Sequence, residues 1–174
     1  MKLSFEIKSQ DRKSFVTHWA AKYDFPQNEK YTDNIGKPLT VQSRQALYEW
    51  KNGSVLSNAK LTSVEENYPL VFDGDLSARY LNHRESGGAI WNIFYLHCLD
   101  QTTWPIFDQH TFRAMRYIRT GQIVEIGYTN KQKYEAYLEE YLPFLRTFEG
   151  EDARQLDKAL FAFGQFLKLA ARYA

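Results

Sequence analysis

The feature that most constrains the fold is the run of residues 86–99, SGGAIWNIFYLHCL, in which apolar side chains follow one another almost without interruption. Folded as a helix, this segment is apolar on nearly every side. A helix at the surface of a protein needs only one apolar stripe, so a helix of this kind belongs in the interior. The sequence therefore predicts a central buried helix around which the rest of the chain packs.

Other segments repeat apolar residues at helical spacing. Residues 11–23 do so, and Thr40 is a suitable N-cap for a helix that ends near Lys51. Further helices are predicted over residues 57–69, 108–121, 128–141 and 152–173. A separate short helix is predicted to end at about residue 81. Residues 24–38, which are rich in Pro, Asn, Asp and Gly, are interpreted as a loop, and residues 1–7 and 122–127 are candidates for short extended segments.

This pattern predicts an all-α fold, a compact helical bundle, because helices do not alternate with strands as in βα units. A chain of 174 residues is expected to form a single helical domain over residues 1–174. The one cysteine, Cys98, cannot form an internal disulfide, and a four-cysteine metal site is excluded. The four histidines lack metal-ligand spacing, so we expect neither a metal nor another cofactor.

The charge and hydropathy of the chain limit its partners. The net charge is +1, so a nucleic acid would have to bind at a local basic patch. The chain begins MKLSFEIKSQ, without an apolar signal core, and has no long uncharged apolar run. We therefore expect a cytoplasmic protein with no membrane partner.

Asp108 is the residue with the clearest chemical interest. It stands directly before the helical segment 108–121, where an aspartate commonly serves as an N-cap worth about 1 kcal/mol. It also begins the pattern Asp108-x-His110-x-x-Arg113, which follows a buried helix that opens with Gly87-Gly88. The pattern alone occurs by chance, whereas its combination with the two glycines, the buried helix and a short connector is more specific.

Residues 86–119 resemble the helix-hairpin-helix DNA glycosylase superfamily, which has the endonuclease III-like fold. In that superfamily a glycine-rich hairpin opens a helix, a connector follows, and an Asp-x-His-x-x-Arg motif begins the next helix. The resemblance implies this fold for the chain and duplex DNA as its partner. It also implies that Asp108 is the catalytic carboxylate, and that His110 and Arg113 have mainly structural roles.

The chain departs from the superfamily at the hairpin, which usually reads Leu-Pro-Gly-x-Gly. Here the matching residues are 84–88, RESGG, so the chain resembles a divergent member with a degraded hairpin. Members with lyase activity have a nucleophilic lysine shortly after the second glycine, whereas Gly88 is followed by Ala-Ile-Trp. The resemblance therefore implies a monofunctional enzyme that uses water.

The remaining site candidates are aromatic and basic residues. A base pocket is predicted from Trp91, Tyr95, Trp104 and Phe107, which could equally pack the core. DNA contacts are predicted for Arg84, Ser86, Gly87, Gly88, Arg113 and Arg116, and Arg119 continues the same helical stripe. These arginines could instead form a salt-bridged surface with Glu125, Glu135 or Glu139.

Three hypotheses follow from the sequence. The first is a DNA glycosylase-like hydrolase of DNA repair, in which Asp108 supports monofunctional base excision. The second is a non-catalytic protein of the helix-hairpin-helix fold that binds DNA or a protein partner, with Asp108 kept only as a cap. The third is an unrelated helical interaction protein that carries the motif by chance.

Overall fold

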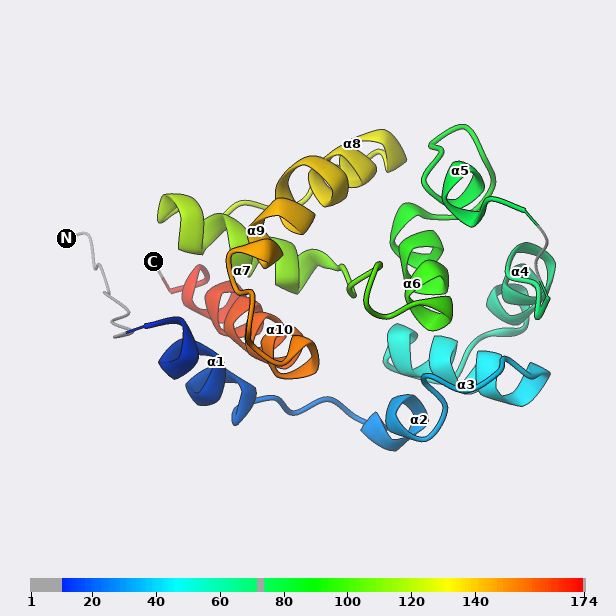
Figure 1. Ribbon diagram of the computed structural model, residues 1–174, viewed down its shortest axis with the longest axis horizontal. Helices are drawn as coiled ribbons and strands as arrows, with labels where there is room; N and C mark the ends of the chain where they lie inside the picture. Colours follow the sequence, from blue (N-terminus) through cyan, green and yellow to red (C-terminus); the bar gives the residue numbers. More distant parts are fainter. Residues whose placement is uncertain (1–10, 72–73, 174) are drawn as a thin grey trace. The chain divides into compact units, whose positions relative to one another are not determined.

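The computed structural model describes residues 11–71 and 74–173. Within these residues it contains ten α-helices, one π-helical segment and no strand (Figure 1), so the prediction of an all-α fold is confirmed. The chain divides into two compact units: unit 1 comprises Met1–Asp24 and Phe107–Ala174, and unit 2 comprises Phe25–Ile106. The single domain expected over residues 1–174 stays a prediction.

Unit 2 is built around the helix that the sequence placed in the interior. Its helices are α2 (Asn28–Thr32), α3 (Val41–Asn52), α4 (Asn58–Asn67), α5 (Leu76–Tyr80) and α6 (Ala89–Leu99). Ile93, Phe94, Tyr95 and Leu96 are four consecutive residues of α6, and all four are fully buried. Because four consecutive residues cover every side of a helix, α6 is a central buried helix, as predicted.

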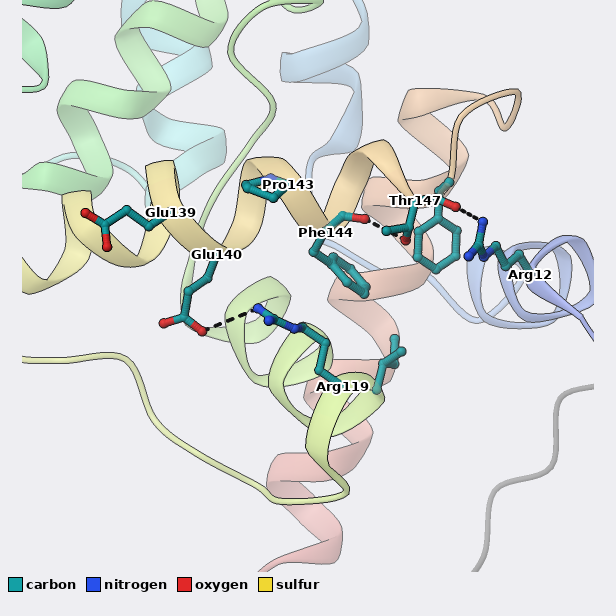
Figure 2. Close-up of a pocket in the computed structure, with 9 residues that line it drawn as sticks. Arg12, Arg119, Glu139, Glu140, Pro143, Phe144 and Thr147 are labelled. Carbon is teal, nitrogen blue, oxygen red and sulfur yellow. Dashed lines mark hydrogen bonds and ion pairs between the residues drawn. The ribbon is translucent and has the colours of Figure 1, made fainter.

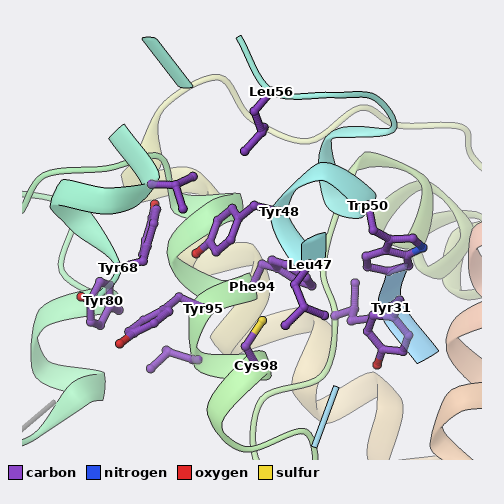
Figure 3. Packing of buried hydrophobic residues seen from close by; sticks show 13 residues of the cluster. Tyr31, Leu47, Tyr48, Trp50, Leu56, Tyr68, Tyr80, Phe94, Tyr95 and Cys98 are labelled. Atoms are coloured by element: carbon purple, nitrogen blue, oxygen red, sulfur yellow. The ribbon is translucent and has the colours of Figure 1, made fainter. Parts of the chain in front are cut away.

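Tyrosines dominate the core of unit 2 (Figure 3). The rings of Tyr48 and Tyr68 stack at 4.9 Å between centroids, and those of Tyr80 and Tyr95 lie 4.7 Å apart. All four hydroxyls donate inside the unit, from Tyr48 to the Trp91 carbonyl, from Tyr68 to Asn92 Oδ1, from Tyr80 to a main-chain carbonyl of α4, and from Tyr95 to the carbonyl of residue 69. These hydrogen bonds remove most of the cost of burying polar groups.

Helix α2 lies in the segment that the sequence predicted to be a loop, and this part of the prediction is wrong. The helix follows Gln27, which has left-handed backbone geometry with φ of 57°. Tyr31 then packs on Trp50 at 4.4 Å between ring centroids, and its hydroxyl lies 2.8 Å from His97 Nε2. A short helix is therefore stabilised here by one buried tyrosine and not by local propensity.

Unit 1 joins the beginning and the end of the chain. Its helical segments are α1 (Arg12–Ala20), α7 (Gln109–Thr120), α8 (Asn130–Glu135), η1 (Ala136–Tyr141), α9 (Leu142–Arg146) and α10 (Ala153–Ala170). Helix α10 packs against both α1 and α7. Phe163 of α10 contacts Phe15 and Trp19 of α1 and Tyr117 of α7, with ring centroids 5.4, 4.8 and 5.7 Å away.

Helices α7 and α10 approach each other very closely at Gly164. A Cβ atom placed on Gly164 would lie only 2.0 Å from the carbonyl oxygen of His110. The absence of a side chain therefore lets the two main chains touch, and the Gly164 carbonyl becomes available to Arg113 of α7 at 2.9 Å. This contact fixes the first turn of α7 against α10.

Several element boundaries differ from those predicted. Helix α6 begins at Ala89 and not at residue 86, because Gly87 has φ of +95° and Gly88 is the extended N-cap. Residues 122–127 form neither helix nor strand, and the extended segment predicted over residues 1–7 lies outside the described residues. The helix predicted to end at Tyr141 continues through η1 into α9, which includes Pro143. No helix in the described part of the chain combines the length and apolar character needed to cross a bilayer.

Candidate functional site

Asp108 is the N-cap of α7. Its Oδ1 accepts hydrogen bonds from the amides of His110 at 2.8 Å and Thr111 at 3.0 Å. The Asp108 amide in turn donates to Thr111 Oγ1 at 3.0 Å, which completes a capping box. The residue is half-buried and lies at the positive end of the helix dipole. The predicted cap is therefore confirmed, and the carboxylate has a fixed orientation.

Arg113 occupies the interior of unit 1 and is only 2% exposed. Its Nε and Nη2 donate to the two carboxylate oxygens of Glu125 at 2.9 and 2.8 Å, a bidentate pair. Its Nη1 donates to the Gly164 carbonyl at 2.9 Å and to His110 Nδ1 at 3.1 Å. Arg113 thus joins α7, α10 and the segment after α7.

His110 is held as a neutral acceptor. A guanidinium can only donate, so His110 Nδ1 must accept from Arg113 and the ring proton lies on Nε2. Burial lowers the pKa of His110; the Arg113 charge adds to this effect, and the Asp108 carboxylate opposes it. The ring also packs on Phe161 of α10 at 4.8 Å between centroids. His110 therefore helps to hold the first turn of α7 in place.

The other arginines of the α7 stripe form ion pairs. Arg116 Nη1 lies 2.7 Å from Glu140 Oε2, and Arg119 Nη1 lies 3.7 Å from the same oxygen. Glu125 pairs with Arg113, as the sequence had allowed, whereas Glu140 was not among the partners expected for the other two. Glu140 belongs to η1, so the π-helical segment supplies the counter-charge of the stripe.

The glycine segment before α6, residues 86–88, forms a turn in unit 2 that contacts with neighbouring side chains hold in place. A Cβ atom on Gly87 would lie 2.4 Å from Asn92 Oδ1, so only glycine fits there. Asn92 Nδ2 donates to the Ser86 carbonyl at 3.2 Å, and Ser86 Oγ donates to Asn67 Oδ1 at 2.9 Å. Arg84 precedes this turn and is exposed. The turn is therefore well defined although its sequence differs from the superfamily hairpin.

The four residues predicted to form a base pocket differ in exposure. Tyr95 and Phe107 are at most 1% exposed: Tyr95 packs in the tyrosine core of unit 2, and Phe107 packs against Tyr137 and Tyr141 of η1. Trp91 and Trp104 are partly exposed and border the core of unit 2. The two tryptophans therefore have surface to offer a ligand, whereas Tyr95 and Phe107 fill cores.

The predicted site residues fall in both units. Unit 1 holds Phe107, Asp108, Arg113 and Arg116, and unit 2 holds Arg84, Ser86, Gly87, Gly88, Trp91, Tyr95 and Trp104. Neither unit alone brings the whole set together. Among the residues that the structure describes, His, Cys, Asp and Glu form no group of three or more that could hold a metal.

The sequence did not reveal two neighbouring pockets on unit 1. One, of about 370 Å³, lies between Arg119 of α7, Glu139 and Glu140 of η1, and Phe144 of α9 (Figure 2). The other, of about 400 Å³, shares Arg12, Ile118 and Phe148 with it. Asp108 lines neither pocket. The walls come from segments more than 100 residues apart, which no local pattern could indicate.

Comparisons with known proteins give no relative: no protein-family model, curated protein or solved structure matches this chain. The function must therefore be argued from the contacts around Asp108.

Proposed function

We propose that the protein is a divergent, monofunctional DNA glycosylase-like hydrolase of the helix-hairpin-helix fold, in which Asp108 is the catalytic carboxylate. The observation that supports the proposal is the geometry of Asp108. Two main-chain amides fix its Oδ1 at the N-terminus of α7 while the residue stays partly exposed. A carboxylate held in this way is oriented before substrate arrives.

The chemistry requires such a group. In base excision the bond between the sugar C1′ and the base nitrogen breaks, and positive charge develops on the sugar. A fixed carboxylate stabilises that charge and orients a water molecule. The water oxygen bonds to C1′, and a water proton balances the electron pair that leaves with the base. The base must first leave the helical stack and enter a pocket.

The proposal assigns different tasks to the other candidates. Arg84, Ser86, Gly87 and Gly88 would contact the DNA backbone, and the partly exposed Trp91 and Trp104 would contact the base. Arg113 would act as a structural support through its bonds to Glu125 and Gly164, because it is too deeply buried to reach a phosphate. Tyr95 and Phe107 would support the pocket from within the cores.

The test is an excision assay on duplexes that each carry one damaged, modified or mismatched base, with abasic sites detected by alkaline cleavage. Asp108→Asn should lower excision by about 100-fold or more, since asparagine has no charge to offset the developing cation. Its stability should stay within about 1 kcal/mol of the wild type, because asparagine caps as well as aspartate. Excision at the wild-type rate would show that Asp108 is only a cap.

Asp152→Asn is the matched control. Asp152 caps α10 by accepting from the Gln155 amide at 2.7 Å, so the same substitution at another helix start should leave excision unchanged. The assay should also be run with borohydride. Because no lysine follows Gly88 closely, no protein–DNA adduct should be trapped. A lysine-dependent adduct would contradict the monofunctional mechanism.

A second candidate is a non-catalytic protein of the same fold that binds DNA or a protein partner. It is favoured by the complete capping box of Asp108, which explains this residue without catalysis. The carboxylates paired with Arg113, Arg116 and Arg119 favour it as well. Salt-sensitive DNA binding without abasic sites on any duplex would support this candidate over the enzyme.

A further inference from the structure

Tyr128 is the most exposed large hydrophobic side chain that the structure describes, with 95% of its surface accessible. It lies between α7 and α8 and is the first residue of the helix predicted over residues 128–141, whereas α8 begins at Asn130. Single exposed apolar residues are common and need no explanation by themselves. Tyr128 differs from other exposed apolar residues in its position near α7 and in the contacts that hold its main chain.

Two contacts show the path of the segment after α7. Glu125 is bound by Arg113 in the middle of α7, and the Ile126 amide donates to Gln109 Oε1 at 3.2 Å in the first turn of that helix. The segment therefore runs back along α7 from Gly121, at the C-terminus, towards the N-terminus (Figure 1). Tyr128 follows Ile126 by two residues, so its main chain lies near the N-terminal end of α7, the end that Asp108 caps.

The main chain around Tyr128 is held firmly. Lys133 Nζ donates to the Tyr128 carbonyl at 3.0 Å. Thr129 caps α8 in a capping box with Gln132, and a Cβ atom on Gly127 would lie 2.6 Å from Cβ of Gln132. The ring is therefore presented to solvent from a fixed support, and ordering it against a ligand costs little conformational entropy.

The chemistry of the turn fits a nucleic acid. An exposed aromatic ring can stack on any base, because every base has a π-face. Lys131, three residues further on, is 63% exposed, and its 3.6 Å contact with Glu135 is a weak surface ion pair that a phosphate can replace. Proteins that bind unstacked bases combine aromatic rings, which stack on the bases, with cations, which contact the backbone.

We infer that Tyr128 stacks on a nucleobase beside the one presented to Asp108, while Lys131 faces the neighbouring phosphate. This inference rests on the proposed function, because it takes the partner to be duplex DNA opened at one base. Stacking on the neighbouring base would hold the duplex open and keep the excised base out of the helix.

The test uses a short fluorescein-labelled duplex with a mismatch and a second duplex with 2-aminopurine beside the mismatch. Tyr128→Ala should weaken binding about 5- to 150-fold, the range that corresponds to loss of one base–aromatic stack. It should also change the 2-aminopurine signal obtained on binding. Tyr128→Phe keeps the ring and should behave as the wild type in both measurements.

Tyr173→Ala is the matched control, because Tyr173 is also an exposed tyrosine of unit 1, at 83%, but lies beyond the end of α10. It should leave binding unchanged. If the wild type binds and excises while Tyr128→Ala matches it in affinity and fluorescence, the inference is wrong and the proposed function stands. If the wild type binds no duplex even at low salt, both are wrong.

Discussion

At the scale of single residues, the Asp108 cap and the proposed catalytic carboxylate depend on the same contacts. The amides of His110 and Thr111 hold Oδ1 because they are unpaired donors of the first helical turn. Those donors also fix the orientation of the carboxylate, and a carboxylate with a fixed orientation is what electrostatic catalysis needs. The cap is therefore compatible with either role, and only a substitution that preserves the cap while removing the charge can separate the two.

His110 should make the stability of the protein depend on pH. Burial holds its pKa below the ordinary value of about 6.5, so below that pH the unfolded chain takes up a proton that the folded protein does not. This part of the stability is present above about pH 6.5 and is lost as the pH falls towards the folded pKa. Urea midpoints measured between about pH 7.5 and about pH 5.5 should show the decrease.

His110→Gln removes this titration but keeps an acceptor for Arg113. Its urea midpoint should therefore fall less than that of the wild type over the same range, because the two proteins differ only at residue 110. Parallel curves for the two proteins would mean that His110 does not contribute to the pH dependence.

The residues of the site were predictable to different degrees. The Asp108 cap follows from its place before a helical pattern, because capping is a local interaction. The burial of Arg113 was not predictable, since its acceptor on Gly164 lies 51 residues away. Tyr128 was missed for a related reason: its exposure depends on the return of the segment along α7, which tertiary contacts determine.

At the scale of elements, the helices with local start and stop signals agree with the sequence. Thr40 is an N-cap, as predicted, and Asp152, where a helix was predicted to begin, is the N-cap of α10. Gly121 ends α7 in left-handed geometry with φ of 70°. Helix α2 was missed because packing of Tyr31 and not composition stabilises it. The π-helical segment was missed because no residue type marks the change of hydrogen-bond pattern before Pro143.

The contact between α7 and α10 should be sensitive to a single methyl group. Gly164→Ala places Cβ 2.0 Å from the His110 carbonyl oxygen, which forces the two helices apart. Alanine favours an isolated helix by about 1 kcal/mol, so an ordinary mid-helix glycine would become more stable on substitution. Here we expect instead a loss of about 1–3 kcal/mol in the free energy of unfolding, because overpacking outweighs propensity.

Urea denaturation would measure this loss. Lys168→Ala, an exposed position on the same helix, serves as the control and should change the free energy of unfolding by less than about 0.5 kcal/mol. A Gly164→Ala protein as stable as the wild type would show that α7 and α10 are not in direct main-chain contact.

At the scale of the whole molecule, the two units are not consecutive in the chain. Unit 1 takes residues from both ends, and Phe107, its first residue after unit 2, immediately precedes Asp108. No feature of the sequence indicates this division, because no long flexible linker or low-complexity stretch separates the parts. The predicted core, by contrast, was recognisable, since a helix that is apolar all round has few alternatives to burial.

The net charge of +1 makes the balance of charges on α7 decisive for any binding of DNA. Glu140 lies 2.7 Å from Arg116 and 3.7 Å from Arg119, so one carboxylate neutralises much of the basic stripe. Glu140→Gln releases both cations. If the stripe contacts phosphates, the affinity for a duplex should rise several-fold at low salt. The slope of log K against log[salt] should steepen by up to about 1.8, because each new phosphate contact adds about 0.9.

Fluorescence anisotropy with a labelled duplex across a salt series would measure both quantities. Glu65→Gln is the control, because it makes the same change in net charge at an exposed position of α4, outside the stripe. It should leave the slope unchanged and alter the affinity only slightly. Far-ultraviolet spectra should show that both variants keep the helical fold. If Glu140→Gln and Glu65→Gln give the same slope as the wild type, Arg116 and Arg119 do not contact phosphates, and the stripe is a salt-bridged surface of unit 1.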